Sequence, residues 1–330
     1  MGQQLAIDVG AVYLRVVVLL PGPPDESLTV LDSLYSPPVE GTYYLLKYTP
    51  DSLESFANHP IFSRLSPSPT PVYISGIGGK LVRKRIESCY GVKLRSTANT
   101  PCLMRGLEYL RVHHPDTFFF FPGSNMRQIS SIGRFNDMSA TKIKGVLEGD
   151  FYPCLLLNLR SGLSIYRLDS PTDHRRIQGS CLGGTTIWSI LKLLTPFQSP
   201  EEAVRASVEG DNTHIDMSVG DIYGSTYDQA GLNSELIASS CAKLRFTENP
   251  APQDLAKSLF GMFILNFTQI TWFISQAEDV GKIIVTGNII TVPGLMDAAQ
   301  ACMNFWSKGT KQLLFNEYSF YLGALGALID

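Results

Sequence analysis

The sequence lacks the cysteine patterns that mark metal-binding and redox domains. Its six cysteines form no C-x-x-C pair and have no metal-type spacing to the five histidines. Charge is also scarce, because 17% of the residues are charged and the formal net charge is −3. The composition therefore gives no electrostatic signal for nucleic acid or an anionic lipid surface. Reduced, buried thiols in a cytoplasmic protein are the expectation.

Long uninterrupted hydrophobic runs are missing as well. The apolar N-terminal stretch is broken by Asp8 and Arg15, so it does not have the form of a secretory signal. Position 6 is neither serine nor threonine, so the myristoylation pattern that Gly2 would begin fails. The longest apolar region, Phe260–Ile274, contains several polar side chains and is expected to be too short and too polar to span a bilayer.

Two short patterns of strand, turn and strand lie about half a chain apart. In Gln4–Leu20, two apolar runs flank a glycine-containing turn, and the same order recurs in Cys154–Leu168 around Arg160-Ser161-Gly162. The repeat predicts two similar α/β domains, each with a turn directed at a shared cleft. A length of 330 residues favours two domains over one. The irregular region 114–150 places the expected boundary between residues 1–151 and 152–330.

Glycine turns follow several of the expected strands, at positions 10, 76–79, 160–162 and 183–186. Glycine tolerates the backbone angles of such turns and has no Cβ, so backbone N–H groups can face an anion. A helix that follows the turn adds a favourable dipole. One such turn usually does no more than reverse the chain. Four of them together favour the interpretation that the protein binds a phosphate-bearing ligand. None fits the P-loop or the dinucleotide fingerprint, which disfavours a P-loop kinase and a Rossmann dehydrogenase.

Three further features have more than one interpretation. Asp8, at the end of an apolar strand beside Gly10, suits either a Mg²⁺-bound water or the capping of a turn. The helical stretch Asp254–Glu278 suits either the core or an interface, and its apolar positions favour the core. The small residues in Tyr321–Leu328 would let a helix approach another backbone or a ligand closely.

From about Tyr152 onward the sequence resembles the type II pantothenate kinases almost continuously. The segments that carry the resemblance are YPCLLLNLRSGLSIYRL, HRRIQGSCLGGTTIWSILKLLT, EGDNTHIDMSVGDIYGSTYDQAGLNSELIASS, IIVTGN and FWSKGTKQLLFNEYSFYLGALGALI. They match, in order, family pieces that include N-I-G-S-G-V-S, S-L-G-G-G-T, G-D-I-Y-G-G, V-G-N and G-A-V-G-A. The N-terminal half is similar over shorter pieces, D-V-G-A-V, S-G-I-G-G and CLMRGLEYL.

The resemblance implies a two-domain, actin-like α/β fold of the acetate and sugar kinase, Hsp70 and actin class, with ribonuclease H-like domains closing on ATP. It implies transfer of the γ-phosphoryl group of MgATP to the primary hydroxyl of pantothenate, the first step of coenzyme A synthesis. It also implies acetyl-CoA or CoA as an inhibitor in the same cleft. The implied assembly is a homodimer, or a heterodimer with a pantothenate kinase paralogue.

The resemblance assigns site residues one by one. Those expected to bind ATP and its phosphates are Asp8, Gly10, Arg15, Ser161, Gly162, Gly183, Gly184, Gly287 and Asn288. Asp8 would hold Mg²⁺ through a water. Ser161 and Arg176 are expected near the pantothenate or acyl-CoA moiety.

The sequence departs from the family at its catalytic position. The general-base glutamate of the family aligns with Arg83, which stays protonated and cannot accept a proton. Glu87 lies one helical turn later and would substitute only if the helix shifted by about a turn.

Other departures affect the phosphate turns. Residues of this chain that replace a glycine or threonine of the family are Ala11, Val12, Arg160 and Thr185. Two hypotheses follow, an active pantothenate kinase with an altered site, and a non-catalytic relative that binds nucleotide or acyl-CoA and pairs with a competent subunit. A third, the same fold with a changed substrate, has no positive support in the sequence.

Overall fold

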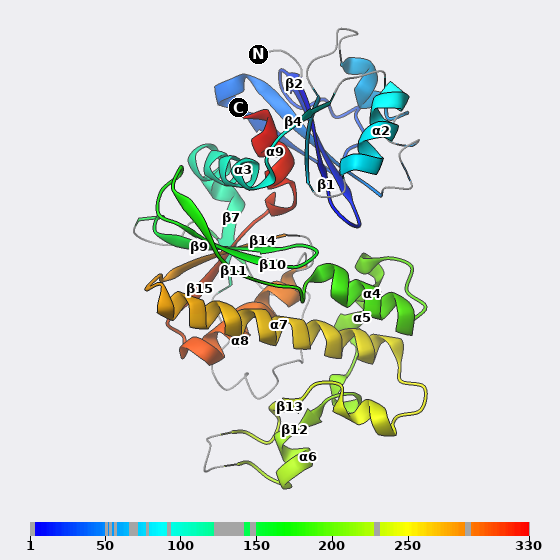
Figure 1. Ribbon diagram of the computed structural model, residues 1–330, viewed down its shortest axis with the longest axis vertical. Coiled ribbons are helices and arrows are strands. Elements are labelled where there is room, and N and C mark those ends of the chain that lie inside the picture. Colours follow the sequence, from blue (N-terminus) through cyan, green and yellow to red (C-terminus); the bar gives the residue numbers. More distant parts are fainter. Residues whose placement is uncertain are drawn as a thin grey trace. The chain divides into compact units, whose positions relative to one another are not determined.

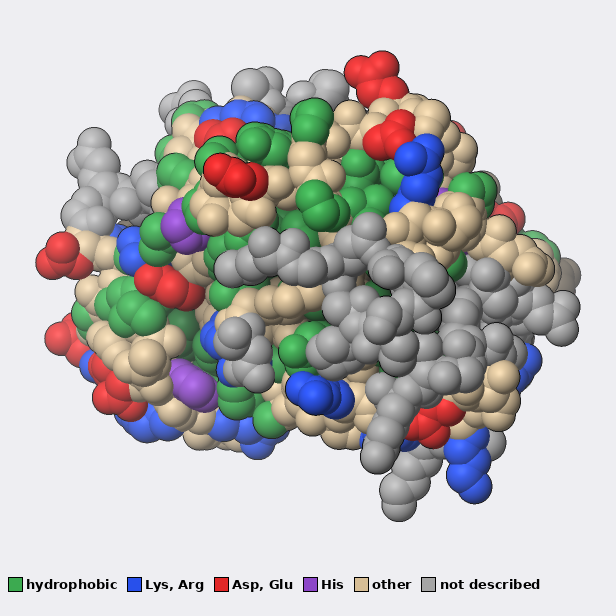
Figure 2. Space-filling model, turned by 90° about the horizontal axis from the view of Figure 1, so that it is seen from above, with side chains coloured by type: hydrophobic (Ala, Val, Ile, Leu, Met, Phe, Trp, Pro, Cys, Tyr) green, Lys and Arg blue, Asp and Glu red, His purple; other side chains and the backbone are tan. Residues whose placement is uncertain are grey.

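The computed structural model describes residues 4–49, 52, 55, 58–65, 72–76, 79–90, 94–121, 142–145, 150–227, 232–287 and 292–329. The chain divides into two compact units (Figure 1). Unit 1 consists of Met1–Phe118 with Glu317–Asp330, and unit 2 of Phe119–Asn316. On the face drawn in Figure 2, acidic and basic side chains are interspersed with hydrophobic ones, in keeping with the small net charge of −3.

Unit 1 is built on a six-stranded sheet in the order β3-β4-β2-β1-β5-β6. Its strands are β1 (Gln4–Val9), β2 (Leu14–Pro21), β3 (Asp32–Ser36), β4 (Gly41–Tyr48), β5 (Val72–Gly76) and β6 (Leu94–Ser96). β1, β2 and β4 pair antiparallel, whereas β5 runs parallel to β1 and β6 parallel to β5. β1 and β2 are buried along nearly their whole length, which explains why they read as apolar runs rather than as alternating patterns.

Unit 2 has a seven-stranded sheet in the order β11-β10-β9-β14-β15-β7-β8. Its strands are β7 (Phe118–Phe120), β8 (Ile143–Lys144), β9 (Cys154–Leu159), β10 (Leu163–Leu168), β11 (His174–Ser180), β14 (Lys282–Gly287) and β15 (Gln312–Asn316). β9, β10 and β11 form an antiparallel meander, and β14 and β15 continue in parallel on the other side of β9.

The core of the second sheet repeats the first. In each, a hairpin of the first two strands continues to a third antiparallel strand, and two parallel strands follow on the far side of the first strand. The hairpins expected in Gln4–Leu20 and Cys154–Leu168 are β1–β2 and β9–β10. The expectation of two similar α/β domains is therefore confirmed, and the duplicated sheet is the architecture of the actin-like class.

Three α-helices of unit 1 lie among its described residues. They are α2 (Gly79–Tyr90), α3 (Asn99–His113) and α9 (Leu322–Leu328). Its short 3₁₀ turns are η1 (Pro37–Val39), η3 (Pro60–Arg64), η4 (Pro115–Thr117) and η9 (Ser319–Tyr321). α9 packs on α3 and on the sheet strands β1 and β5, although it lies at the far end of the sequence (Figure 1).

The α3–α9 contact depends on glycine in both helices. A Cβ at Gly326 would lie 1.8 Å from the carbonyl oxygen of Cys102, and one at Gly106 would lie 2.2 Å from that of Leu322. The small residues of the C-terminal segment thus serve a close helix-to-backbone approach, as expected. Because this contact returns the C-terminal residues to unit 1, the units of the structure differ from the sequence-based division into 1–151 and 152–330.

Unit 2 carries its helices around a large hydrophobic core. They are α4 (Gly184–Leu194), α5 (Pro200–Glu209), α6 (Val219–Tyr223), α7 (Pro252–Ala277) and α8 (Pro293–Ser307), with the turns η6 (Asn212–His214) and η8 (Ala242–Phe246). A two-stranded sheet of β12 (Met217–Ser218) and β13 (Ile237–Ser239) completes the unit.

The long helix α7 is a core element. Its side chains Phe260, Phe263, Ile264 and Phe267 are all buried, which confirms the core interpretation of the stretch Asp254–Glu278. In the described part of the chain, α7 is the one helix that is long and apolar enough to cross a membrane. However, 56% of its apolar window is buried inside the protein. Core helices of this length pass the same test, so the feature is explained by packing.

The region 114–150 contains more structure than its sequence suggests. The Phe118–Phe121 run includes strand β7, and Phe119 and Phe121 belong to the hydrophobic core of unit 2. Residues 122–141 and 146–149 lie outside the described residues, so the expectation of irregular structure there stays a prediction.

Candidate functional site

The glycine turns at 160–162 and 183–186 meet in unit 2. The turn Arg160–Gly162 follows β9, and Gly183 lies against it so closely that a Cβ there would be 2.3 Å from the Cα of Gly162 and 2.4 Å from the oxygen of Ser161. The N–H of Gly184 donates to the carbonyl of Arg160 at 2.7 Å. Helix α4 begins at this junction. Four predicted phosphate-site residues, Ser161, Gly162, Gly183 and Gly184, are therefore brought together.

Gly287 joins the same cluster through the end of β9. Its φ is +129°, and a Cβ would lie 2.0 Å from the carbonyl oxygen of Leu159. Unit 1 has an equivalent glycine, because Gly76 at the end of β5 has φ +97° and a Cβ there would lie 2.1 Å from the oxygen of Val9. In unit 1 this glycine allows β5 to pass against the end of β1, and in unit 2 its equivalent allows β14 to pass against the end of β9. Asn288 lies outside the described residues.

Replacing Gly183 by alanine is expected to separate the two turns. The atoms in the way are backbone atoms of Ser161 and Gly162, which cannot move aside as a flexible side chain would. We expect the ATP affinity predicted for this site to fall about 10- to 100-fold, because separated turns lose a backbone hydrogen bond to a charged phosphate, worth about 1.5–3 kcal/mol. Titration calorimetry with ATP measures the change. The control is Gly281→Ala, whose Cβ would meet nothing within 4 Å. Equal affinities of the two variants would contradict the prediction.

Arg176 lies on β11, which leads into the glycine turn at 183–186. Its side chain is exposed, and a guanidinium nitrogen lies 2.0 Å from the position that a Cβ would take at Gly179. Ser161 is exposed as well. Both residues are therefore accessible on unit 2, as a role toward an acidic or acylated ligand requires, and that role stays a prediction.

The first turn, in unit 1, is arranged differently. The carboxylate of Asp8 is fully buried, with a relative exposure of 0%. One of its oxygens accepts a hydrogen bond from Ser75 at 3.2 Å, and the other pairs with Arg15 at 3.4 Å. Because both oxygens are engaged and shielded from solvent, the residues around Asp8 do not fit a metal-bound water. Within the described part of the chain, no group of three or more His, Cys, Asp or Glu side chains is suited to a metal ion.

Arg83, at the expected catalytic position, ties helix α2 to strand β6. Its Nε donates to Glu87 Oε1 at 3.1 Å, while its two terminal nitrogens donate to Ser96 Oγ and to the carbonyl of Leu94. The same oxygen of Glu87 accepts the N–H of Leu94 at 3.3 Å. The two residues therefore form one polar link, hereafter the α2–β6 clamp, in which one carboxylate oxygen of the partly exposed Glu87 is held by an arginine and a backbone N–H.

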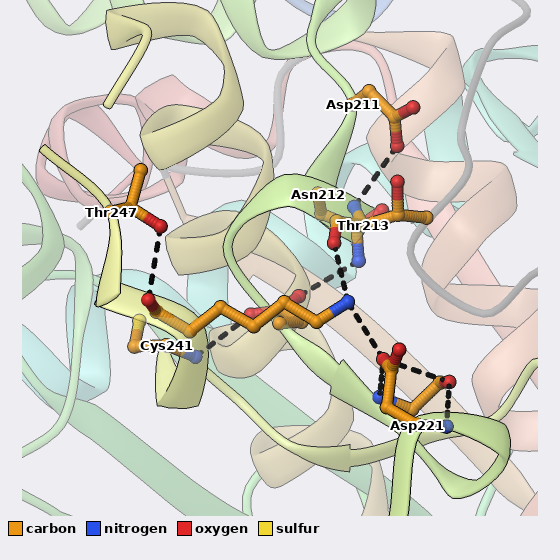
Figure 3. A network of polar contacts seen from close by, with 9 residues as sticks. Asp211, Asn212, Thr213, Asp221, Cys241 and Thr247 are labelled. Atoms are coloured by element: carbon orange, nitrogen blue, oxygen red, sulfur yellow. Dashed lines mark hydrogen bonds and ion pairs between the residues drawn. The ribbon is translucent and has the colours of Figure 1, made fainter. Parts of the chain in front are cut away.

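Sequence reasoning missed a polar pocket of about 290 Å³ in unit 2. Lys243 lines it and donates to Asp221 at 2.7 Å and to the carbonyl of Thr213 at 2.8 Å, two acceptor residues that are labelled in Figure 3. The hydrogen bond from Lys243, together with those from Ser218, lowers the pKa of Asp221. Asp221 lies in the matched G-D-I-Y-G segment, but Lys243 lies in no recognisable motif, so only the fold connects them. Of the pocket's charged groups, Lys243 and Asp221 pair with each other, and the carboxylate of Asp216 accepts hydrogen bonds from neutral donors.

The duplicated sheets and the glycine turns at the strand ends define a two-domain α/β protein of the actin-like class. The chain belongs to the Fumble family, that of the type II pantothenate kinases, which matches residues 43–330. This assignment agrees with the resemblance that the sequence segments carry.

Named relatives match part of the chain. It is 39% identical over 185 residues to a pantothenate kinase of Schizosaccharomyces pombe, covering 54% of this chain and 46% of that protein. It is 39% identical over 186 residues to pantothenate kinase 1 of Arabidopsis thaliana, covering 54% and 49% respectively. The matched region thus spans about half the length of these relatives.

Among solved structures, a glucokinase of Balamuthia mandrillaris in complex with glucose is similar with a TM-score of 0.46 and 12% identity, covering 99% of this chain and 93% of that one. A glucokinase of the ROK family from Streptomyces griseus, in complex with glucose and AMPPNP, has a TM-score of 0.44 and 12% identity, covering 99% and 98%.

Proposed function

We propose that the chain is a pantothenate kinase-type protein of coenzyme A biosynthesis that binds ATP and acyl-CoA but transfers phosphate slowly or not at all on its own. The family reaction converts ATP and pantothenate to ADP and 4′-phosphopantothenate. Membership in the Fumble family and the named pantothenate kinases among its relatives support the pathway. The α2–β6 clamp is the observation that carries the doubt about turnover.

The expected loss of rate follows from the missing general base. A general base typically accelerates proton transfer about 10²- to 10⁴-fold. Arg83 is permanently protonated, and Glu87 is anchored by its Oε1 to Arg83 and to the N–H of Leu94, one helical turn from the catalytic position of the family. Phosphoryl transfer otherwise depends on positioning and charge. An isolated chain is therefore expected to retain binding through the unit 2 turns while losing most of its rate.

A second candidate function is that of a non-catalytic subunit. The clamp favours it, because a residue pair used to hold a helix to a strand is no longer available for chemistry. In this role the chain would form a heterodimer with a competent pantothenate kinase in the cytoplasm, and its own nucleotide or acyl-CoA would regulate the pair. A homodimer is the corresponding assembly for the first function.

The purified chain is expected to bind ATP and acetyl-CoA without forming 4′-phosphopantothenate at a rate comparable to that of an intact relative. The experiment combines titration calorimetry with a radiometric kinase assay, using the pantothenate kinase of Schizosaccharomyces pombe as the positive control. Turnover within about tenfold of the control would overturn the proposed loss of rate, since absence of the base predicts a rate at least about 10²-fold lower. Co-expression with a competent paralogue tests the second candidate, which predicts a mixed dimer.

A further inference from the structure

A row of polar side chains crosses the sheet of unit 1 beneath its first turn. In the strand register Asp8 on β1 faces Arg15 on β2 and Ser75 on β5, and Arg15 in turn faces Lys47 on β4. Directly opposed residues project from the same face of a sheet, so their side chains meet. The contacts of Asp8 with Ser75 and Arg15 follow from this register. The row lies at the end of β1, where the phosphate turn begins.

The guanidinium of Arg15 fills the space over the glycine of that turn. A Cβ at Gly10 would lie 2.8 Å from one terminal nitrogen of Arg15 and 3.2 Å from the other. Glycine in such a turn leaves room for an anion to approach the backbone. In this protein the guanidinium of Arg15 occupies the space beside Gly10 that an anion would otherwise enter.

An aromatic pair covers the guanidinium from the other side. The ring of Phe320, from η9, lies 4.5 Å from the guanidinium carbon of Arg15. Tyr13 of the turn itself packs on Phe320 with ring centroids 6.0 Å apart, and Lys47 lies 4.8 Å over the Tyr13 ring. The N–H of Gly10 donates to the carbonyl of Tyr13 at 2.9 Å, so this donor is used within the turn. Arg15 is consequently 1% exposed.

Charge explains why the arrangement is stable. A buried cation is costly unless a buried anion compensates it, and Asp8 is that anion. A planar guanidinium can pair with a carboxylate at its edge while it stacks on an aromatic ring with its face. The ammonium of a lysine, compact and strongly hydrated, cannot do both. The sealed turn is therefore specific to arginine at position 15.

We propose that Arg15 is the built-in occupant of the first turn and closes it to phosphate, so that a bound nucleotide is held through the unit 2 turns alone. The proposal rests on the proposed nucleotide binding. A phosphate-binding cation would strengthen ATP binding, whereas Arg15 in the sealed turn weakens it. Arg15 determines which of the two phosphate turns takes an anion. Removing its guanidinium opens the turn and strengthens ATP binding.

The test compares Arg15→Lys with the wild-type chain by calorimetric titration of ATP and of acetyl-CoA. Opening the turn is expected to raise ATP affinity about tenfold, the equivalent of one hydrogen bond to a charged group. The matched control is Arg64→Lys, because Arg64 forms an exposed pair with Asp25 in the same unit. Its ATP affinity is expected to stay within about twofold of wild type. A variant that was merely destabilised would not gain affinity.

Each outcome decides one of the two proposals. An unchanged or weaker ATP affinity of Arg15→Lys overturns the sealed turn, and a loss of tenfold or more would show that Arg15 binds phosphate. Wild-type protein that binds neither ATP nor acetyl-CoA overturns the proposed function, whereas the sealed turn still stands if the variant gains ATP binding. If Arg15→Lys does not fold, Arg15→Gln replaces it, because this change also removes the guanidinium and keeps a hydrogen-bond donor for Asp8. The same gain in ATP affinity is expected, and its absence is equally decisive.

Discussion

Arg83→Glu, which restores the residue type of the family at the catalytic position, is expected to lower stability and, because Ala11, Arg160 and Thr185 remain in the phosphate turns, to give no kinase activity. The substitution removes the donors to Ser96 and to the carbonyl of Leu94, and it places a carboxylate one helical turn from Glu87. Lost hydrogen bonds and like charges at this spacing together cost about 1–3 kcal/mol, a range that allows for the partial exposure of the pair. Urea unfolding and the kinase assay measure the two effects.

The control for Arg83→Glu is the same change at Lys84, the next residue of the helix. Lys84 is exposed, so Lys84→Glu is expected to change stability by less than about 0.5 kcal/mol. A charge-swapped double variant, Arg83→Glu with Glu87→Lys, restores the pair within α2 but not the bonds to β6. It is expected to recover part of the lost stability. An unchanged urea midpoint of Arg83→Glu would contradict the structural role of the clamp, and formation of 4′-phosphopantothenate by this variant would show that the missing base alone limits the rate.

Gly326→Val is expected to have the largest effect on stability, about 3 kcal/mol or more. The new Cβ would lie 1.8 Å from the carbonyl oxygen of Cys102 and 2.6 Å from the backbone nitrogen of Gly106. Neither atom can yield without moving α3, so the two helices must separate and expose buried surface on both. The fall in the urea midpoint, or a failure to obtain soluble protein, reports the effect.

Gly281→Val is the matched control, because a Cβ there has nothing within 4 Å. Limited proteolysis adds a second readout, since Gly326 lies in unit 1 and Gly281 in unit 2. For Gly326→Val we expect cleavage within unit 1 to accelerate before cleavage within unit 2. A wild-type urea midpoint in this variant would show that the α3–α9 contact is not needed for stability.

Much of the fold could be predicted because its strands are buried and contiguous in sequence. The apolar runs of β1–β2 and β9–β10 were visible, as was the helix that became α7. The return of α9 to unit 1 could not be read from the sequence, because local patterns do not say which partner a small-residue helix will take. The phenylalanine run at 118–121 was uninterpretable for the same reason, since its partners lie in β15 and β8.

The candidate site was predictable to a similar degree. The glycines at 162, 183 and 184 were recognised from their motifs, and their mutual contact follows from the topology. The partners of Arg83 and Arg15 in other elements were not foreseeable, because Leu94 reaches Arg83 through the pairing of β6 with β5, and Phe320 comes from the C-terminal segment. A substitution in a motif shows that a role has changed, whereas the contacts show what the new role is.

The return of α9 to unit 1 has a consequence for how the protein emerges from the ribosome. Unit 2 is a continuous segment, Phe119–Asn316, and can complete its core once that segment has been synthesised. Unit 1 begins first but needs residues 317–330 to cover α3 and the strands β1 and β5. The N-terminal unit is therefore completed after unit 2, and the faces of α3, β1 and β5 that α9 covers stay uncovered until residues 317–330 have been synthesised.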